Sequence, residues 1–286
     1  MKMKAAAFTD KMILVRGGGD LATGVIHKLH QSGYQVLILE CDRPSAIRRH
    51  VAFCEAVYDG TAEVEGVVCR RITENDIRTQ CRKCWVQGEI PLLTDTHGKY
   101  IRELEPEAVI DAILAKKNLG TSRDMAPLTV GLGPGFTAGE DVDYVIETMR
   151  GHTLGRVIRT GEPIPNTNIP GLIGGFTGER VLRAPDDGIF HQLADIGARV
   201  QAGDVVGEVN GKPMACTIAG VIRGMLADGT PVYKGMKSGD VDPRGELSYC
   251  YTASDKAIAI GGGVLQAILE YTGVLSNVTG QNAWEV

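Results

Sequence analysis

The chain has 286 residues, an apolar content of 43% and a formal net charge of −5, enough material for more than one hydrophobic core. The acidic balance argues against nucleic-acid binding, which normally needs a basic patch. No apolar run approaches the roughly 18 residues that cross a bilayer, and the opening MKMKAAAFTDKM has no apolar stretch of the kind found in secretory signals. We expect a cytoplasmic protein that binds neither nucleic acid nor a membrane.

The seven cysteines are irregularly spaced, which favours a reduced protein over a disulfide framework. Only Cys81 and Cys84 stand close together, and a zinc ribbon would need a second such pair. Cys54 or Cys69 could complete a site. A reduced pair near the end of a surface helix is the interpretation we favour, and we predict no metal site.

The first elements predict a strand–helix–strand unit around a glycine turn. Residues 12–15 are apolar, residues 21–29 have helical apolar spacing after Asp20, and residues 34–39 form a second buried strand. Between the first strand and the helix, GGGDLA matches the G-x-G-x-x-G/A pattern of dinucleotide-binding domains. Bare amides at a helix N-terminus can receive a phosphate.

An acidic residue ends the second strand, about 20 residues beyond the glycines, where such a side chain can bind ribose hydroxyls. A tight turn that binds nothing is the alternative, because many α/β folds keep glycines for packing alone. The cofactor-binding residues predicted in this unit are Gly17, Gly18, Gly19, Asp20 and Glu40.

Further strands alternate with helix-like stretches such as residues 74–84. This alternation predicts a Rossmann-like, doubly wound, mostly parallel sheet over residues 1–160. Three arginines after the second strand, Arg43, Arg48 and Arg49, are interpreted as a solvated or carboxylate-paired face rather than as a phosphate site. The additional strands are expected at residues 56–58, 66–69, 90–94, 109–113 and 128–131.

A second glycine cluster, GLGPGFTAGED, follows the last of these strands. Gly133, Gly135, Thr137 and Gly139 would leave amides open as an anion nest, and a structural loop is the alternative. The cluster lacks the Lys-Ser/Thr ending of a P-loop.

Beyond it, the polar stretch ETMRGHTLGR is densely charged. It makes Glu147, Arg150, His152 and Arg156 candidates for cofactor or inter-domain contacts.

The C-terminal half contains a repeat. Gly188, Gly197 and Gly203 have the same spacing as Gly220, Gly229 and Gly235, within short alternating β sequence. Neither copy can bury a face alone, so the two should pack together. The pattern resembles the biotinyl/lipoyl-type barrel-sandwich hybrid, which we expect over residues 161–286 with its core at residues 181–243.

Lys212 is the lysine near the position that carrier domains of that type modify. It stands in an Asn-Gly-Lys-Pro turn without the usual neighbours. A simple turn lysine is the interpretation we favour, with a modified carrier lysine as the alternative.

The stretch SDKAIAIGGGVLQAI follows the repeat and has a helical apolar pattern. Three glycines within a helix would each cost about 1 kcal/mol relative to alanine. We therefore predict that residues 261–263 form a helix entry where backbone, ligand or a partner chain comes close. Asp255 and Lys256 are further cofactor-binding candidates, with an exposed ion pair as the alternative.

The chain has no G-x-S-x-G elbow, no H-E-x-x-H motif and no kinase motifs. The catalytic residues are therefore unknown, and this combination of anion-binding loops without a catalytic set favours binding, delivery or assembly over turnover.

Several stretches together, among them VRGGGDLATGVIHKL, GLGPGFTAGEDVDYVIETMRGHTLGRVI and SDKAIAIGGGVLQAI, resemble the YqeB family, and more distantly the XdhC-type proteins. The resemblance runs from about residue 13 to 270. It implies an accessory or maturation factor of a selenium-dependent molybdenum hydroxylase that handles a nucleotide or a molybdopterin-type cofactor. The apoenzyme of that hydroxylase would be the partner, and homo-oligomers are left open.

The chain departs from the family pattern at Met149 and Ile258, and the second departure weakens an anion site there. An NAD(P)-dependent oxidoreductase is the alternative function, and NAD(P) is the alternative cofactor.

Overall fold

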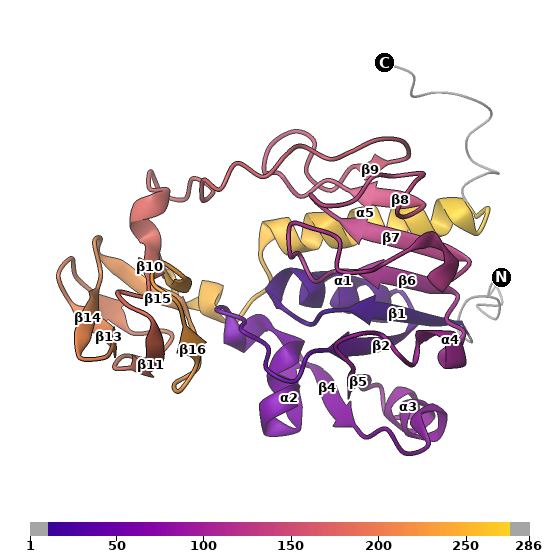
Figure 1. The fold of residues 1–286 in the computed structure, drawn as a ribbon, viewed down its shortest axis with the longest axis horizontal. Helices are drawn as coiled ribbons and strands as arrows, with labels where there is room; N and C mark the ends of the chain where they lie inside the picture. The colour runs from indigo at the N-terminus through magenta and orange to yellow at the C-terminus, as the bar shows by residue number, and fades with distance from the viewer. Residues whose placement is uncertain (1–10, 275–286) are drawn as a thin grey trace, which may run out of the picture.

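The computed structural model describes residues 11–274, so part of the polar opening stretch lies outside the described residues. Figure 1 shows an α/β part joined to a smaller β part. Two segments connect them: the linker, residues 159–177, and the chain that returns from the β part into the last helix.

The α/β part is built on one nine-stranded sheet of order β3-β4-β5-β2-β1-β6-β7-β8-β9. Six of its strand pairs are parallel, and the two outermost pairs, β3–β4 and β8–β9, are antiparallel. The strands are β1 (Met12–Arg16), β2 (Gln35–Glu40), β3 (Thr61–Val64), β4 (Val67–Ile72), β5 (Ile90–Thr94), β6 (Ala108–Asp111), β7 (Leu128–Leu132), β8 (Tyr144–Ile146) and β9 (Val157–Ile158).

Helices cover both faces of this sheet because its central strands are apolar on both sides. Ile13 and Val15 of β1 belong to the core under α1 and α5, while Leu14 belongs to the core under α3 and α4. The helices are α1 (Asp20–Gln31), α2 (Ala56–Asp59), α3 (Ile77–Val86), α4 (Ile101–Leu104) and α5 (Asp255–Tyr271). Short 3-10 turns occur at Arg49–Val51, Phe53–Glu55, Arg123–Met125, Gly178–Arg180 and Leu247–Cys250.

The expected doubly wound Rossmann-like arrangement is wrong. A doubly wound sheet needs a helical crossover between successive parallel strands, but the connection from β6 to β7 holds only a 3-10 turn and that from β7 to β8 holds no helix. The antiparallel edge pairs make the sheet mixed. Residues 56–58, expected as a strand, form the short helix α2.

The β part consists of two four-stranded antiparallel sheets, β10-β17-β15-β12 and β14-β13-β11-β16. The second copy of the glycine repeat supplies β15 and β17 of the first sheet, and the first copy adds the short strand β12 to it. In the second sheet, β11 and β13 come from the first copy and the short strand β16 comes from the second. The strands are β10 (Val181–Arg183), β11 (Gly188–Gln192), β12 (Arg199–Val200), β13 (Val205–Val209), β14 (Lys212–Ala215), β15 (Gly220–Met225), β16 (Pro231–Val232) and β17 (Lys237–Asp242).

The assignment of this part to a biotinyl/lipoyl-type barrel-sandwich hybrid is also corrected. The structure has two antiparallel sheets enclosing their own core around Phe190 and Ile222, and neither it nor the comparisons below show a biotinyl domain. Lys212 opens β14, and its Nζ donates to Asp186 at 2.6 Å.

The glycines of residues 261–263 do not form a helix entry, because α5 runs through them without a break. A side chain at Gly261 would come within 2.9 Å of the Gly24 carbonyl of α1, and one at Gly263 within 2.1 Å of the Gly155 carbonyl. The glycines let two backbones approach α5, a packing gain that outweighs their low helix propensity. Helix α5 thereby joins the α/β core.

Within residues 11–274, no helix has the length and apolar character needed to cross a lipid bilayer.

Candidate functional site

The predicted phosphate-binding turn is occupied by the chain's own groups. The Gly18 amide donates a 2.6 Å hydrogen bond to Oε2 of Glu40, and Oε1 of Glu40 accepts a 2.7 Å bond from the Cys41 amide. The Gly17 amide donates to the Leu39 carbonyl at 2.8 Å. Glu40 therefore serves as an internal acceptor, and its negative charge repels an anion from the same amides.

The outer side of the turn packs against residues 53 and 54. The Cys54 amide donates to the Gly18 carbonyl at 2.9 Å, and a side chain at Gly18 would come within 3.0 Å of the Cys54 nitrogen. Thr23 Oγ1 accepts from the Phe53 amide at 2.9 Å and donates to the Gly18 carbonyl at 3.1 Å. At this turn, only Gly19 has open space beside it.

The second glycine loop is closed in a similar way. A side chain at Gly135 would come within 2.6 Å of the Lys117 backbone, so the loop packs against its neighbour. Three of the four amides expected to bind an anion are paired internally: Gly133 with the Ile146 carbonyl at 2.9 Å, Thr137 with the Asp141 carboxylate at 2.8 Å, and Gly139 with the Val142 carbonyl at 2.7 Å.

The buried side chain of Glu147 joins the loop after β8 to the linker through hydrogen bonds. Its carboxylate accepts from the Met149 amide at 2.7 Å and from the Ile164 amide at 2.8 Å. His152 and Arg156 are exposed and line neither of the two cavities described next. Of the polar grouping predicted from the sequence, Arg150 is the member that lines these two cavities.

Four arginines line one cavity of about 430 Å³ where the α/β part, the linker and the β part meet. Arg48 comes from the loop after β2, Arg150 from the loop after β8, Arg223 from β15 and Arg244 from the loop after β17. Asp255, at the start of α5, is the one carboxylate among the residues that line this cavity. The charged side chains that line the cavity are therefore mainly basic, although each of the four arginines also lies within 4 Å of a carboxylate.

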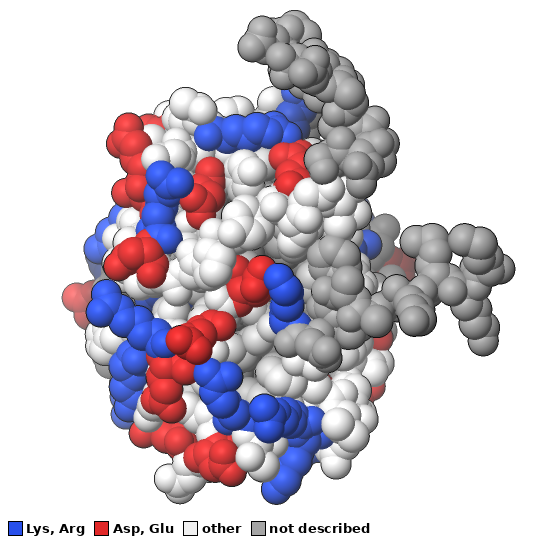
Figure 2. All heavy atoms as spheres, turned by 90° about the vertical axis from the view of Figure 1, so that its right-hand side faces the viewer, with Lys and Arg blue, Asp and Glu red and all other residues white. Residues whose placement is uncertain are grey.

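Figure 2 shows a different distribution on the end of the α/β part that faces away from the β part. There, the basic and acidic side chains are interspersed, and the coloured residues form no extended area of one sign. The grouping of arginines at the junction is thus a local feature of a chain whose net charge is negative.

Arg48 has an unsatisfied group inside the protein. The residue is 9% exposed; its Nη2 donates to the Tyr249 and Thr252 carbonyls at 2.8 and 3.0 Å, and its Nη1 lies 3.5 Å from Asp20. Its Nε is buried and has no hydrogen-bond partner among the described residues. Burial lowers the pKa of Arg48, and the charge of Asp20 opposes that effect. An unpaired buried donor costs about 1–3 kcal/mol.

A buried chain of alternating charges holds the other arginines in place. Asp240 accepts from Arg180 and, at 2.8 Å, from Nε of Arg223, while Asp242 accepts from Arg223 at 3.2 Å and from Arg244 at 2.6 Å. Burial alone would raise the pKa of Asp242, but the hydrogen bonds from Arg244 and the charge of Arg223 lower it overall. The guanidinium groups of Arg223 and Arg244 are therefore held in place before any ligand binds.

A second cavity, of about 260 Å³, shares Arg150 with the first. Apolar side chains such as Leu21 and Leu132 line it together with Lys256. Lys256 is half-buried, and burial, followed by the charge of Arg150, lowers its pKa. The two cavities thus combine a cationic chamber with a more apolar one.

Of the residues predicted as a site, Arg150, Asp255 and Lys256 are brought together. Arg150 donates to both oxygens of Asp255, at 2.6 and 3.0 Å, and this contact lowers the pKa of Asp255. Sequence reasoning missed Arg223 and Arg244. The run Asp240-Val241-Asp242 within the β repeat could have indicated them, because carboxylates that become buried need cationic partners.

Within residues 11–274, no group of three or more His, Cys, Asp or Glu side chains is placed to hold a metal ion. Cys81 and Cys84 lie on α3 as free thiols and are both buried. Burial raises the pKa of Cys81 to about 12 and also raises that of Cys84, which makes both thiols poor nucleophiles.

No protein-family model matches the chain. Among solved structures, it is 11% identical to the ectoine utilization protein EutE (DoeB) of Ruegeria pomeroyi, covering 81% of this chain and 85% of that one, with a TM-score of 0.25. It is 12% identical to an aspartoacylase family protein of Mesorhizobium loti, covering 76% of this chain and 59% of that one, with a TM-score of 0.23. TM-scores this low carry no inference about fold or activity.

The function predicted from the sequence is corrected. The solved structures compared are named as an ectoine utilization protein, an aspartoacylase family protein and a succinylglutamate desuccinylase, and none of these names refers to molybdenum hydroxylase maturation. The glycine turn supported both that role and the alternative NAD(P)-dependent oxidoreductase. The amides of Gly17 and Gly18 in this turn are paired within the chain, and Cys54 packs against it. Binding of a molybdopterin-type cofactor or NAD(P), partnership with a hydroxylase apoenzyme and homo-oligomers stay predictions.

A curated relative confirms the coarser part of the resemblance. The chain is 46% identical over 259 residues to the uncharacterized protein YqeB of Escherichia coli K12, covering 91% of this chain and 47% of that protein. The chain thus spans about half the length of the curated relative it matches. It is therefore a relative of YqeB over that half.

Proposed function

We propose that the chain binds a small molecule with at least two negative charges in the arginine-lined cavity. The observation that carries this proposal is the placement of four guanidinium groups around one cavity, with the buried Nε of Arg48 lacking a partner. Guanidinium groups match carboxylate and phosphate oxygens in paired hydrogen bonds. Each hydrogen bond to such a charged group is worth about 1.5–3 kcal/mol.

The proposal concerns binding, because the residues that line this cavity form no catalytic set. Ser254 Oγ accepts from the Ala257 amide at 3.2 Å and caps α5. The guanidinium carbon of Arg244 lies over the Tyr249 ring, 4.2 Å from the centroid of that ring. The lining residues include no nucleophile paired with a general base, which turnover of the common hydrolytic kinds requires.

Both cofactors expected from the sequence carry phosphate groups, and NADPH and pyrophosphate represent this chemistry among the probes. Isothermal titration calorimetry with the full chain, using pyrophosphate, citrate, NADPH and neutral glucose, tests the proposal. We expect at least one anion to bind and glucose not to bind. The affinity should fall when the salt concentration rises, because screening weakens charge–charge attraction.

The variant Arg150→Gln is the sharpest test of the site. Arg150 pairs with an exposed carboxylate, so its loss should change stability little. We expect anion binding to weaken about tenfold or more, because a charge-assisted hydrogen bond is lost. The matched control is Arg159→Gln, which removes another arginine–carboxylate pair, with Glu270, away from both cavities. Equal weakening in the two variants, or no binding of any anion, would overturn the proposal.

A further inference from the structure

We infer that the side-chain amine of Lys256 is a carbonyl-reactive site, which forms an imine with an anionic aldehyde or ketone bound across the two cavities. This inference deepens the proposed function, and its choice of an anionic ligand rests on that function. The reactivity of the amine itself rests on the local surroundings of Lys256, so the two can fail separately.

The position of Lys256 gives its amine access to a bound ligand. It is the second residue of α5, and it lines the cavity of about 260 Å³ together with apolar side chains, including those of Leu21 and Leu132. Among residues 11–274, its Nζ has no hydrogen-bond or ion-pair partner. By comparison, Lys212 and Lys99 both donate to carboxylates at the surface.

Burial of Lys256, together with the charge of Arg150, favours the neutral amine, and three nearby carboxylates oppose this effect. Arg150 contributes positive charge across the shared wall of the two cavities, and the N-terminal end of α5 carries a partial positive charge. Three carboxylates face the amine, and each is engaged elsewhere: Asp255 by Arg150, Glu147 by two backbone amides, and Asp20 by a neighbouring arginine. Burial and Arg150 lower the pKa of Lys256, as expected for a desolvated lysine beside a cation.

The chemistry needs only the lysine and the carbonyl compound. The unprotonated Nζ adds its electron pair to the carbonyl carbon, and a proton moves from nitrogen to oxygen to give a carbinolamine. Loss of the hydroxyl as water then forms the C=N bond, so one water leaves for each imine and no oxidant or reductant is consumed. An anionic group on the same molecule would lie toward the arginines, with Arg150 between the two cavities.

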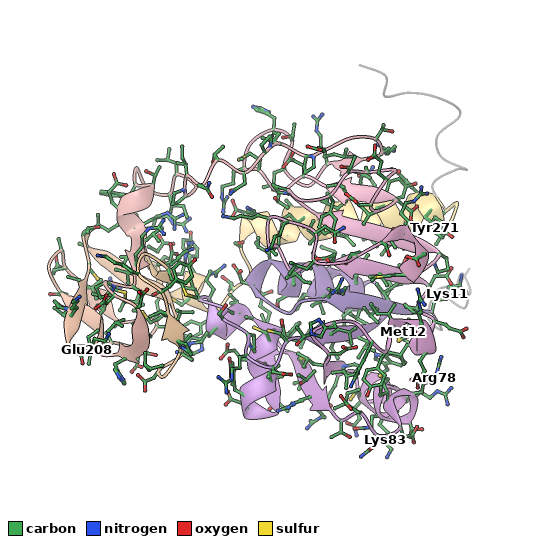
Figure 3. All side chains as sticks on the ribbon, in the orientation of Figure 1. Lys11, Met12, Arg78, Lys83, Glu208 and Tyr271 are labelled. Atoms are coloured by element: carbon green, nitrogen blue, oxygen red, sulfur yellow. The ribbon has the colours of Figure 1, made fainter. Side chains whose placement is uncertain are left out.

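Pyridoxal 5′-phosphate is a suitable probe because it carries an aldehyde and a phosphate. The full chain is incubated with it at pH 7, reduced with borohydride, and analysed by intact mass and peptide mapping. Lys83, which projects from α3 away from the cavities (Figure 3), is the internal reference. We expect Lys256 to be labelled about tenfold faster than Lys83 or more, because its amine is activated and the aldehyde is held nearby.

The variants Lys256→Arg and Lys83→Arg complete the design, since each keeps the positive charge. The first should lose the rapid label and the second should keep it. If pyrophosphate binds by calorimetry but Lys256 is labelled no faster than Lys83, the inference is overturned while the proposed function stands. If Lys256 reacts rapidly with pyridoxal and with its phosphate alike, and pyrophosphate slows neither reaction, the amine is reactive as inferred and the proposed anion site fails.

Discussion

Glu55 is a carboxylate in the 3-10 turn before α2, and burial raises its pKa to about 7. Arg49 lies 3.8 Å away and opposes this effect only in part, while Oε1 of Glu55 is buried without a hydrogen-bond partner in the described chain. The folded protein therefore holds a proton on Glu55 between pH 4.5 and 7 that the unfolded chain releases. Its contribution to stability is present below pH 4.5 and is lost as the pH rises through 7.

The variant Glu55→Gln removes this ionisation and should stabilise the protein at pH 8 by about 1–3 kcal/mol, after allowance for solvent screening. At pH 5 the difference from wild type should be much smaller, because Glu55 is then protonated in the folded state. Urea denaturation of both proteins from pH 5 to 8 measures the change. A constant difference across this range would contradict the prediction.

Single residues also show where sequence reasoning works and where it stops. The pattern around Gly17 correctly placed a tight turn between β1 and α1. The pattern could not indicate that the Glu40 carboxylate would accept a hydrogen bond from the Gly18 amide, because a ribose-binding acid and a turn-capping acid occupy the same position in the chain. Arg48 was interpreted as carboxylate-paired, and it does lie near Asp20, but its burial depends on the β part.

Among the elements, α5 offers a matched pair of neighbouring glycines. A side chain at Gly263 would come within 2.1 Å of the Gly155 carbonyl, whereas at Gly262, which is exposed, nothing lies within 4 Å. We expect Gly263→Ala to destabilise the protein by about 1–3 kcal/mol through overpacking. Gly262→Ala should instead stabilise it by up to about 1 kcal/mol through helix propensity. Thermal or urea denaturation of both variants checks the opposite signs.

The three glycines explain why α5 could not be predicted correctly from local preference. Helix propensity counts a cost for each glycine, and that cost is visible in the sequence. The gain comes from α1 and from Gly155, which approach α5 from distant parts of the chain. By contrast, strands such as β5 follow directly from short apolar runs, and residues 90–94 were predicted with the bounds that the structure has.

For the whole molecule, the segment of residues 47–49 ties the α/β part to the β part. Arg49 donates from Nε to the Met225 carbonyl at 2.9 Å and from Nη2 to Gln192 at 3.1 Å, and the Met225 amide donates to the Ile47 carbonyl at 2.8 Å. A side chain at Gly224 would come within 2.8 Å of Ile47. The two parts therefore meet through a backbone-level contact at β15.

The variant Arg49→Ala should loosen this contact by about 1–3 kcal/mol, because two hydrogen bonds from a charged group are lost. Calorimetric unfolding should then broaden or split, and proteolysis within the linker should speed up. Arg43 is an exposed arginine earlier in the same loop, so the control variant is Arg43→Ala. It should leave both the unfolding transition and the rate of proteolysis unchanged. A single sharp transition in the Arg49 variant, with the midpoint of wild type, would contradict this role.

The cavity itself could not be predicted from the sequence because its arginines are far apart in the chain. Arg48, Arg150, Arg223 and Arg244 come from different loops and strands, and only the return of α5 and the packing of the β part bring them together. Composition indicated the opposite sign, since the chain is acidic overall. Of the predicted residues, Arg150, Asp255 and Lys256 reach the cavities because they flank this junction.

The place of α5 has a consequence for synthesis on the ribosome. One layer of the first hydrophobic core comes from residues that emerge only after the whole β part has been made. Until then, the apolar surface of α1 and of the sheet beneath it has no cover. A nascent chain halted before residue 255 should therefore recruit chaperones, although most of its first domain has already been translated.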